Sequence, residues 1–74
     1  CNIYPIPANN ILNINAEFSL VSLKIMDYSG RLKSVGVVND KNGSVEVSQL
    51  PQGYYIVQVQ TTGGLISRTI QIVR

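Results

Sequence analysis

Residues 50–59 read Leu50-Pro-Gln-Gly-Tyr-Tyr-Ile-Val-Gln-Val59, and this stretch decides the fold class of the chain. Proline presets its own φ and glycine adopts positive φ without strain, so Pro51 and Gly53 predict a tight turn. The residues after the turn alternate, with Tyr55, Val57 and Val59 on one face, as in a β-strand. The segment therefore predicts a turn followed by a central strand, and it shows no catalytic group.

The composition is that of one small folded domain. The chain has 74 residues, of which 45% are hydrophobic and 14% charged, which is too apolar for a disordered chain. A domain of this size buries only about 60–65% of the surface that its unfolded chain exposes, so we expect a thin core without room for a ligand cavity. The low share of charged residues also indicates that a partner covers part of the surface.

Outside the opening segment, turn residues interrupt β-branched and aromatic residues at short intervals, and helical periodicity is nearly absent. This pattern predicts an all-β fold, an antiparallel β-sandwich of about six or seven short strands, in a single domain over residues 1–74. The expected strands are 11–16, 21–26, 31–38, 44–48, 54–60 and 65–73, with the extended segment 3–7 as a seventh.

The period of two along each strand predicts which side chains face the core. Arg68 also falls on the inward parity, which indicates an edge position or a side chain that extends to solvent. The apolar residues expected to face inward are Leu12, Ile14, Val21, Leu23, Ile25, Val45, Val47, Ile66, Ile70 and Ile72.

Glycines mark the expected turns. The strongest turn signal is residues 39–43, whose Asn42-Gly43 pair favours a type I′ hairpin. Gly30 is expected at positive φ in a second hairpin turn, over residues 27–30. The small residues Ser34 and Gly36 indicate an edge or a bulge within the strand 31–38.

The sequence does not indicate catalytic, metal or cofactor chemistry. It has no histidine, which excludes Ser–His, Cys–His and most zinc arrangements, and its single Cys1 has no base to activate it. Residues 39–43 resemble a calcium loop but lack the downstream acidic ligand, so a hairpin turn is expected there instead. We expect no enzyme, no metal and no cofactor, because turns and exposed strand positions account for all four carboxylates: Glu17, Asp27, Asp40 and Glu46.

Other classes of binding protein fit less well. The six basic residues are scattered rather than gathered in a stripe, so we expect no nucleic-acid binding. Tyr54 and Tyr55 must point to opposite faces of their strand, so at most one can join a sugar-binding platform. No apolar run approaches 18 residues, and no signal peptide is visible. Cys1 is interpreted as the point where a longer chain was cut, rather than as a lipid-anchor site or reactive thiol.

Four turn-and-strand blocks span the chain in order. The first, residues 3–14, contains Tyr4, Pro5 and Pro7. The second, residues 25–31, ends in a turn formed by Asp27, Gly30 and Arg31. The third is the opening segment, with Leu50, Gly53 and Tyr55, and the fourth is the closing strand 70–74, which ends on a basic residue.

The order and spacing of these blocks resemble the C-terminal sorting domain of the type IX (Por) secretion system of Bacteroidetes. The first block resembles the YPNPA-type start of that family, although Ile6 stands where the family usually has asparagine. The second resembles its D-x-x-G-R/K turn, the third its L-x-x-G-x-Y block, and the fourth its apolar final strand. The resemblance covers the whole chain.

The resemblance implies a sorting signal with an Ig-like β-sandwich, not a catalyst. Domains of this family are continuous with an N-terminal cargo protein, fold in the periplasm, and are recognised by outer-membrane shuttle and translocon proteins. A sortase-like peptidase then removes the domain upstream of the sandwich, and the cargo reaches the cell surface or the extracellular space. The motif residues of the first three blocks would then be mainly structural.

The final strand, Ile70, Gln71, Ile72, Val73 and Arg74, is the expected recognition element. An edge strand carries unpaired backbone groups that a partner strand can extend, and the same groups would allow an edge-strand dimer. A chain that ends directly after this strand favours a sorting signal. The alternatives are an Ig- or fibronectin-like adhesion or carbohydrate-binding module of a surface protein, or an inert spacer.

Overall fold

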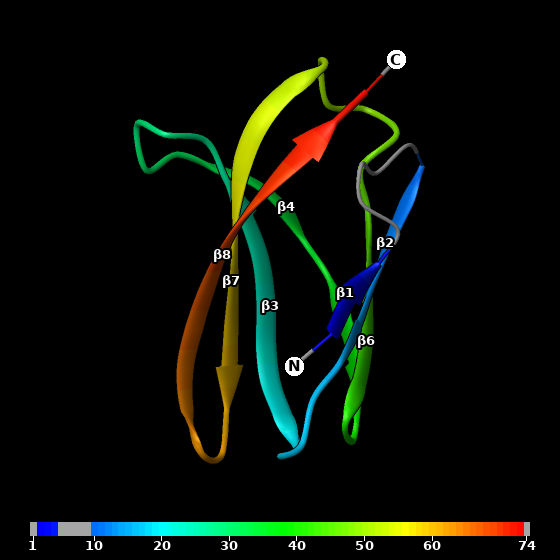
Figure 1. Ribbon diagram of the computed structural model, residues 1–74, viewed down its shortest axis with the longest axis vertical. Helices are drawn as coiled ribbons and strands as arrows, with labels where there is room; N and C mark the ends of the chain where they lie inside the picture. Colours follow the sequence, from blue (N-terminus) through cyan, green and yellow to red (C-terminus); the bar gives the residue numbers. More distant parts are fainter. Residues whose placement is uncertain (1, 5–9, 74) are drawn as a thin grey trace.

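The computed structural model describes residues 2–4 and 10–73, and in these residues it is all-β, with two four-stranded antiparallel sheets packed as a sandwich (Figure 1). The predicted fold class is therefore confirmed. The first sheet has the order β1-β2-β6-β5, formed by β1 (Asn2–Tyr4), β2 (Ile11–Asn15), β6 (Asn42–Glu46) and β5 (Val37–Asn39). The second has the order β4-β3-β7-β8, formed by β4 (Leu32–Val35), β3 (Leu20–Met26), β7 (Gly53–Thr61) and β8 (Gly64–Ile72).

The described residues form eight strands, more than the six or seven expected, because the predicted strand 31–38 is divided at Gly36. Before this glycine, β4 pairs with β3, and after it β5 pairs with β6 in the other sheet. The Gly36 amide donates a hydrogen bond to the Leu23 carbonyl at 2.7 Å. A Cβ atom at position 36 would lie 2.6 Å from Leu23 Cδ2 and 2.7 Å from the Ser44 carbonyl oxygen, so only glycine lets the chain pass between the sheets here.

The core lies between the two sheets and is built from the inward faces of β2, β3, β6, β7 and β8. The prediction for β7 is confirmed, since this strand lies between β3 and β8 and alternates buried and partly exposed residues. Ile66 is half-buried against the core. The buried apolar residues are Leu12, Ile14, Ala16, Leu20, Leu23, Ile25, Val45, Val47, Leu50, Tyr55, Val57, Val59, Ile70 and Ile72.

The expectation that Val21 faces the core is wrong, because Val21 is 58% exposed and its neighbour Leu20 is buried. The register between β3 and β7 shifts there: Leu20 lies opposite Thr61, but Ser22 lies opposite Gln60. One extra residue in β3 reverses the alternation, as a β-bulge does. The prediction assumed that side chains alternate without interruption from Val21 to Leu23, and the bulge breaks this alternation.

The expected Asn42-Gly43 turn is also displaced. Asn42 and Gly43 belong to β6, and the turn consists of Asp40 and Lys41, with Asp40 at a φ of 53°. The connection between β2 and β3 holds this turn in place: the Leu20 amide donates to the Asp40 carbonyl at 2.7 Å, and the Ser19 hydroxyl to the Asp40 carboxylate at 2.9 Å. The hydrogen bonds from Ser19 and Leu20 thus favour a turn at Asp40, two residues before the Asn42-Gly43 pair.

No helix in the described part of the chain is long and apolar enough to span a membrane.

We predict that Gly36→Ala destabilises the fold by about 2–3 kcal/mol, because the added methyl group overlaps the Leu23 side chain and the Ser44 backbone. Urea unfolding followed by circular dichroism measures the change. Gly30→Asn is the control, since Gly30 lies at a φ of 85° with open space around it, and asparagine adopts positive φ at little cost. A Gly36→Ala variant as stable as the control would contradict the crossing as described.

Candidate recognition site

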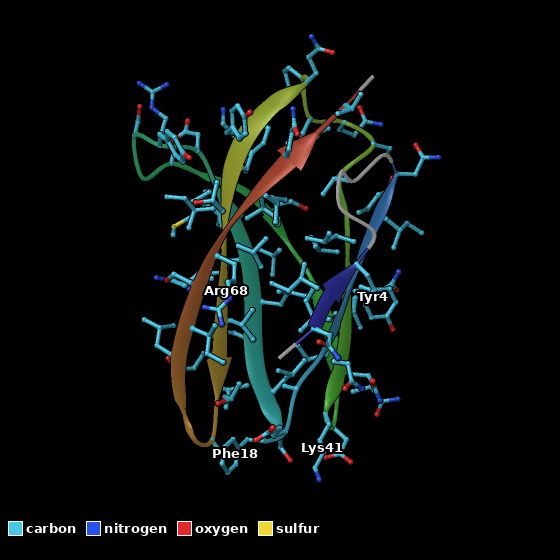
Figure 2. The ribbon with its side chains drawn as sticks, in the orientation of Figure 1. Tyr4, Phe18, Lys41 and Arg68 are labelled. Carbon is cyan, nitrogen blue, oxygen red and sulfur yellow. The ribbon has the colours of Figure 1, made fainter. Side chains whose placement is uncertain are left out.

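The motif turns and the end of the final strand lie at one end of the sandwich (Figure 1). The turn after β3, the turn before β7 and the end of β8 all lie at that end, because Met26 is paired with Ile56 and Gly53 with Ile72. Figure 2 shows Phe18 and Lys41 at the opposite end, with the turns 16–19 and 40–41. The second, third and fourth blocks of the sequence pattern therefore share one end of the molecule.

Asp27 organises the turn between β3 and β4. Its carboxylate oxygen Oδ1 accepts hydrogen bonds from the backbone amides of Arg31 and Ser29, both at 2.9 Å, and Lys33 Nζ lies 3.8 Å from Oδ2. The Arg31 amide, followed by that of Ser29 and the nearby positive charges, lowers the pKa of Asp27 against the opposing effect of desolvation. The predicted positive φ at Gly30 is confirmed at 85°. This block of the pattern is a self-contained turn.

Tyr55 organises the turn before β7. Its ring is buried in the core and its hydroxyl donates to the Pro51 carbonyl, four residues upstream, at 2.8 Å. A tyrosine hydroxyl that returns to the backbone a few residues upstream is the tyrosine-corner arrangement of Ig-like sandwiches. Leu50 is buried beside it, and Gly53 adopts a φ of 148°. One turn thus contains all three motif residues: the Leu50 and Tyr55 side chains are buried, and Gly53 supplies the positive φ.

β8 is an edge strand of the second sheet, with β7 on one side only. The structure separates the four described residues of the predicted recognition element into two groups. Ile70 and Ile72 are each 1% exposed and belong to the core, whereas Gln71 and Val73 are exposed. Arg74 lies outside the described residues. The side chains available to a partner on this stretch are therefore those of Gln71 and Val73.

The register shows which backbone groups of β8 point away from β7. In an antiparallel pair, alternate residues exchange both backbone hydrogen bonds with the partner, and the residues between them direct their N–H and C=O groups to the other side. The β7–β8 register closes at the hairpin pair Thr61–Gly64, across a two-residue turn. The pair that flanks a two-residue turn exchanges both backbone hydrogen bonds, and so do the even-numbered residues of β8 that follow Gly64. The odd-numbered residues from Leu65 to Gln71 therefore direct their N–H and C=O groups to the open edge.

The first block contributes a second edge strand. Tyr4 is exposed on β1, which pairs with β2 at the edge of the first sheet (Figure 2). Pro5 and Pro7 lie outside the described residues. Tyr4 is paired with Asn13 in the first sheet, and the exposed Tyr54 is paired with Gln71 in the second, so these two rings lie on different sheets and form no common platform for a sugar.

Sequence reasoning missed an apolar row on the outer face of the second sheet. Leu32 lies opposite Met26, and Met26 lies opposite Ile56, so three apolar side chains line up across β4, β3 and β7. Leu32 is 56% exposed, and the other two are partly exposed. The signal was present as outward apolar residues on separate strands, but their alignment depends on the register.

The described residues offer neither a metal site nor a charged pocket beside the open edge of β8. Within residues 2–4 and 10–73, no group of three histidine, cysteine, aspartate or glutamate side chains could hold a metal ion. A shallow hollow of about 240 Å³ on the first sheet is lined by Asn13, Val37, Asn39, Asn42, Gly43 and Ser44, none of which carries a charge.

Comparison with known proteins identifies one family. The family model described as "Secretion system C-terminal sorting domain" matches residues 2–73. No curated protein and no solved structure matches the chain significantly.

We predict that Tyr55→Phe lowers the free energy of unfolding by about 1 kcal/mol, because it removes one partly buried hydrogen bond and leaves the Pro51 carbonyl without its donor. Tyr54→Phe is the matched control, since the neighbouring ring is 60% exposed, and we expect it to change stability by less than about 0.5 kcal/mol. Urea unfolding of both variants measures the difference. Equal losses would show that the turn does not depend on the Tyr55 hydroxyl.

The pKa of Asp27 predicts a pH-dependent contribution to stability. Because folding lowers this pKa below its unfolded value of about 3.9, the contribution is complete above that pH and is lost as the pH falls through the folded pKa. Asp27→Asn keeps an acceptor oxygen for the two amides but removes the charge. The variant should therefore be less stable than the wild type at pH 6, and the difference should shrink at pH 2.5.

Urea unfolding at the two pH values tests the Asp27 prediction. Glu17→Gln removes an exposed carboxylate outside the turn and controls for the change in net charge. A destabilisation by Asp27→Asn that is the same at both pH values would contradict the prediction.

Proposed function

Because the chain belongs to the family of secretion system C-terminal sorting domains, we propose that it is recognised as a folded β-sandwich through the open edge of β8. Membership in this family makes the chain a sorting signal of the type IX secretion system. Such a signal is part of a cargo protein that is exported across the outer membrane toward the cell surface or the extracellular space.

The observation that carries the proposal is the open edge of β8. The strand is nine residues long, its inner side chains Ile70 and Ile72 are locked in the core, and its other edge has no neighbour among the described strands. A strand held rigidly on one side presents its outward N–H and C=O groups in fixed positions, so an added strand gains hydrogen bonds without ordering this chain further.

The partners we propose are the outer-membrane shuttle and translocon proteins of the secretion system. They would meet the domain in the periplasm, after it has folded. Recognition would then report that the signal is folded, since the edge exists only when β8 is paired with β7. After transport, a sortase-like peptidase would remove the domain upstream of the sandwich and release or anchor the cargo.

Family motif residues support this recognition indirectly. Asp27, Gly30 and Arg31 form one turn, and Leu50, Gly53 and Tyr55 form another, beside the end of β8. Gly53 begins β7 opposite Ile72, so the second turn adjoins the end of β8, whose register is set by the hairpin pair Thr61–Gly64. We therefore assign these residues the task of placing the recognised strand.

We predict that Thr69→Pro blocks export of a passive reporter fused ahead of the domain. Residue 69 directs its N–H group to the open edge, so proline removes a donor that a partner strand needs and leaves the pairing with β7 intact. Export into the medium, measured by immunoblot in a bacterium that carries the secretion system, should fall by about tenfold, as expected for a loss of about 1.4 kcal/mol in recognition.

Two measurements make the export test specific. Thr69→Ala is the matched control, because it removes the same side chain and keeps the N–H group, and it should be exported like the wild type. Urea unfolding of the purified domain shows whether the proline variant still folds. Normal export of a folded Thr69→Pro variant would overturn the proposal that the β8 edge is recognised.

A further inference from the structure

One cation lies on the inward face of the open edge strand. Arg68 is in register with Val57, which is fully buried, and shares its parity with Ile66 and Ile70. Its own side chain is nevertheless exposed, because β8 has no neighbour on its other side. Figure 2 labels Arg68 about midway along β8.

Arg68 has no acidic partner in the described part of the chain. Its Nη1 atom donates to the carbonyl of its neighbour Ser67 at 3.2 Å, and the one ion pair among the described residues joins Lys33 to Asp27. The side chains nearest to it in the strand pattern are aliphatic. A charge beside apolar groups at a sheet edge is a means by which proteins discourage unwanted strand pairing.

The position of Arg68 disfavours pairing of β8 with a second copy of itself. In an antiparallel pair of two β8 strands, the register that sets Ile66 opposite Ile70 sets Arg68 opposite Arg68, and like charges directly opposite each other are destabilising. Shifting the register by two residues places Arg68 opposite Ile70, so a charge is covered by an aliphatic side chain. The edge-strand dimer expected from the sequence is therefore disfavoured at β8.

The same position favours a partner strand of a particular chemistry. A strand added antiparallel to β8 would place side chains opposite Ile66, Arg68, Ile70 and Ile72 on the inner face. Apolar residues would extend the core at three of these positions, and a carboxylate would pair with Arg68 at the remaining one. Such a pair would be partly covered by the added strand, which makes it stronger than a fully exposed ion pair.

We propose that β8 accepts a partner strand that carries an aspartate or glutamate opposite Arg68, with apolar residues two positions away on each side. The inference deepens the proposed function, because it takes the recognised edge from that proposal and adds the chemistry of the partner. Arg68 then selects partners in two ways, by rejecting a second copy of the chain and by attracting an acidic strand.

The test uses two synthetic peptides and the 74-residue chain. One peptide has the sequence Thr-Val-Thr-Val-Thr-Glu-Thr-Val-Thr, and the other has lysine in place of glutamate. We expect the glutamate peptide to bind about fivefold more tightly, measured by fluorescence anisotropy of labelled peptides at low salt, and we expect 1 M salt to reduce the preference. Arg68→Glu should reverse the preference.

Lys24→Glu is the matched control. Lys24 lies on β3 in the same sheet but on its outer face, opposite Gln58, so the variant makes the same change in net charge away from the inner face of β8. It should leave the preference for the glutamate peptide unchanged. Equal binding of both peptides, failure of the glutamate peptide to bind, or an equal effect of Lys24→Glu would overturn the inference.

A second measurement tests the rejection of a second copy. Arg68→Val makes the inner face of β8 continuously apolar from Ile66 to Ile72, so this variant should form dimers at concentrations at which the wild type is monomeric. Light scattering coupled to size-exclusion chromatography measures the mass. An Arg68→Val variant that stays monomeric would show that Arg68 does not prevent pairing at this edge.

The two proposals fail in different ways. If Thr69→Pro is exported normally while the glutamate peptide still binds in preference, the export machinery does not use this edge although the edge has the proposed chemistry. If Thr69→Pro blocks export while neither peptide is preferred, the edge is recognised but Arg68 does not select the partner.

Discussion

The passage of the chain from one sheet to the other at Gly36 is the contact on which this sandwich depends. The Gly36 amide is bonded to the Leu23 carbonyl, and the space that a Cβ atom would need is filled by Leu23 and by the Ser44 backbone. The chain also crosses between the sheets after β2 and after β6, but at Gly36 it joins two edge strands, β4 and β5, so the sheets are connected along one side and open along the other. The open side is bordered by the edge strands β1 and β8.

That arrangement gives β8, the strand proposed for recognition, a part in the core as well. A domain of 74 residues buries only a small apolar core. Two of its most deeply buried side chains, Ile70 and Ile72, belong to β8, which is paired on one edge only. Burial of a side chain of this size stabilises the fold by about 1.5–3 kcal/mol. Burial of these side chains holds β8 in place on β7, as the proposed strand addition requires, and in the further proposal Arg68 limits which strands can be added.

The sequence pattern of the family is thus divided between two tasks. The turns at Asp27 and at Tyr55 satisfy their own backbone groups, by a carboxylate in the first case and by a phenol hydroxyl in the second. These turns lie at the same end of the molecule as the end of β8, and they directly precede β4 and β7. We propose that the motif residues are mostly structural and that recognition takes place on β8.

The sequence by itself determined the fold class, the central strand after Leu50, the positive φ at Gly30 and most of the core, because alternation and turn residues are local properties. It also determined the family, because the order of the blocks along the chain does not depend on how they pack. Only the tertiary structure decided that Val21 faces outward, that the turn uses Asp40 and Lys41, and that the strand 31–38 is divided between two sheets. Each of these depends on a partner distant in the sequence: β7 for the bulge, the β2–β3 connection for the turn, and Leu23 for the crossing. The edge position of β8, which the sequence could only suggest through the parity of Arg68, follows from the same long-range pairing.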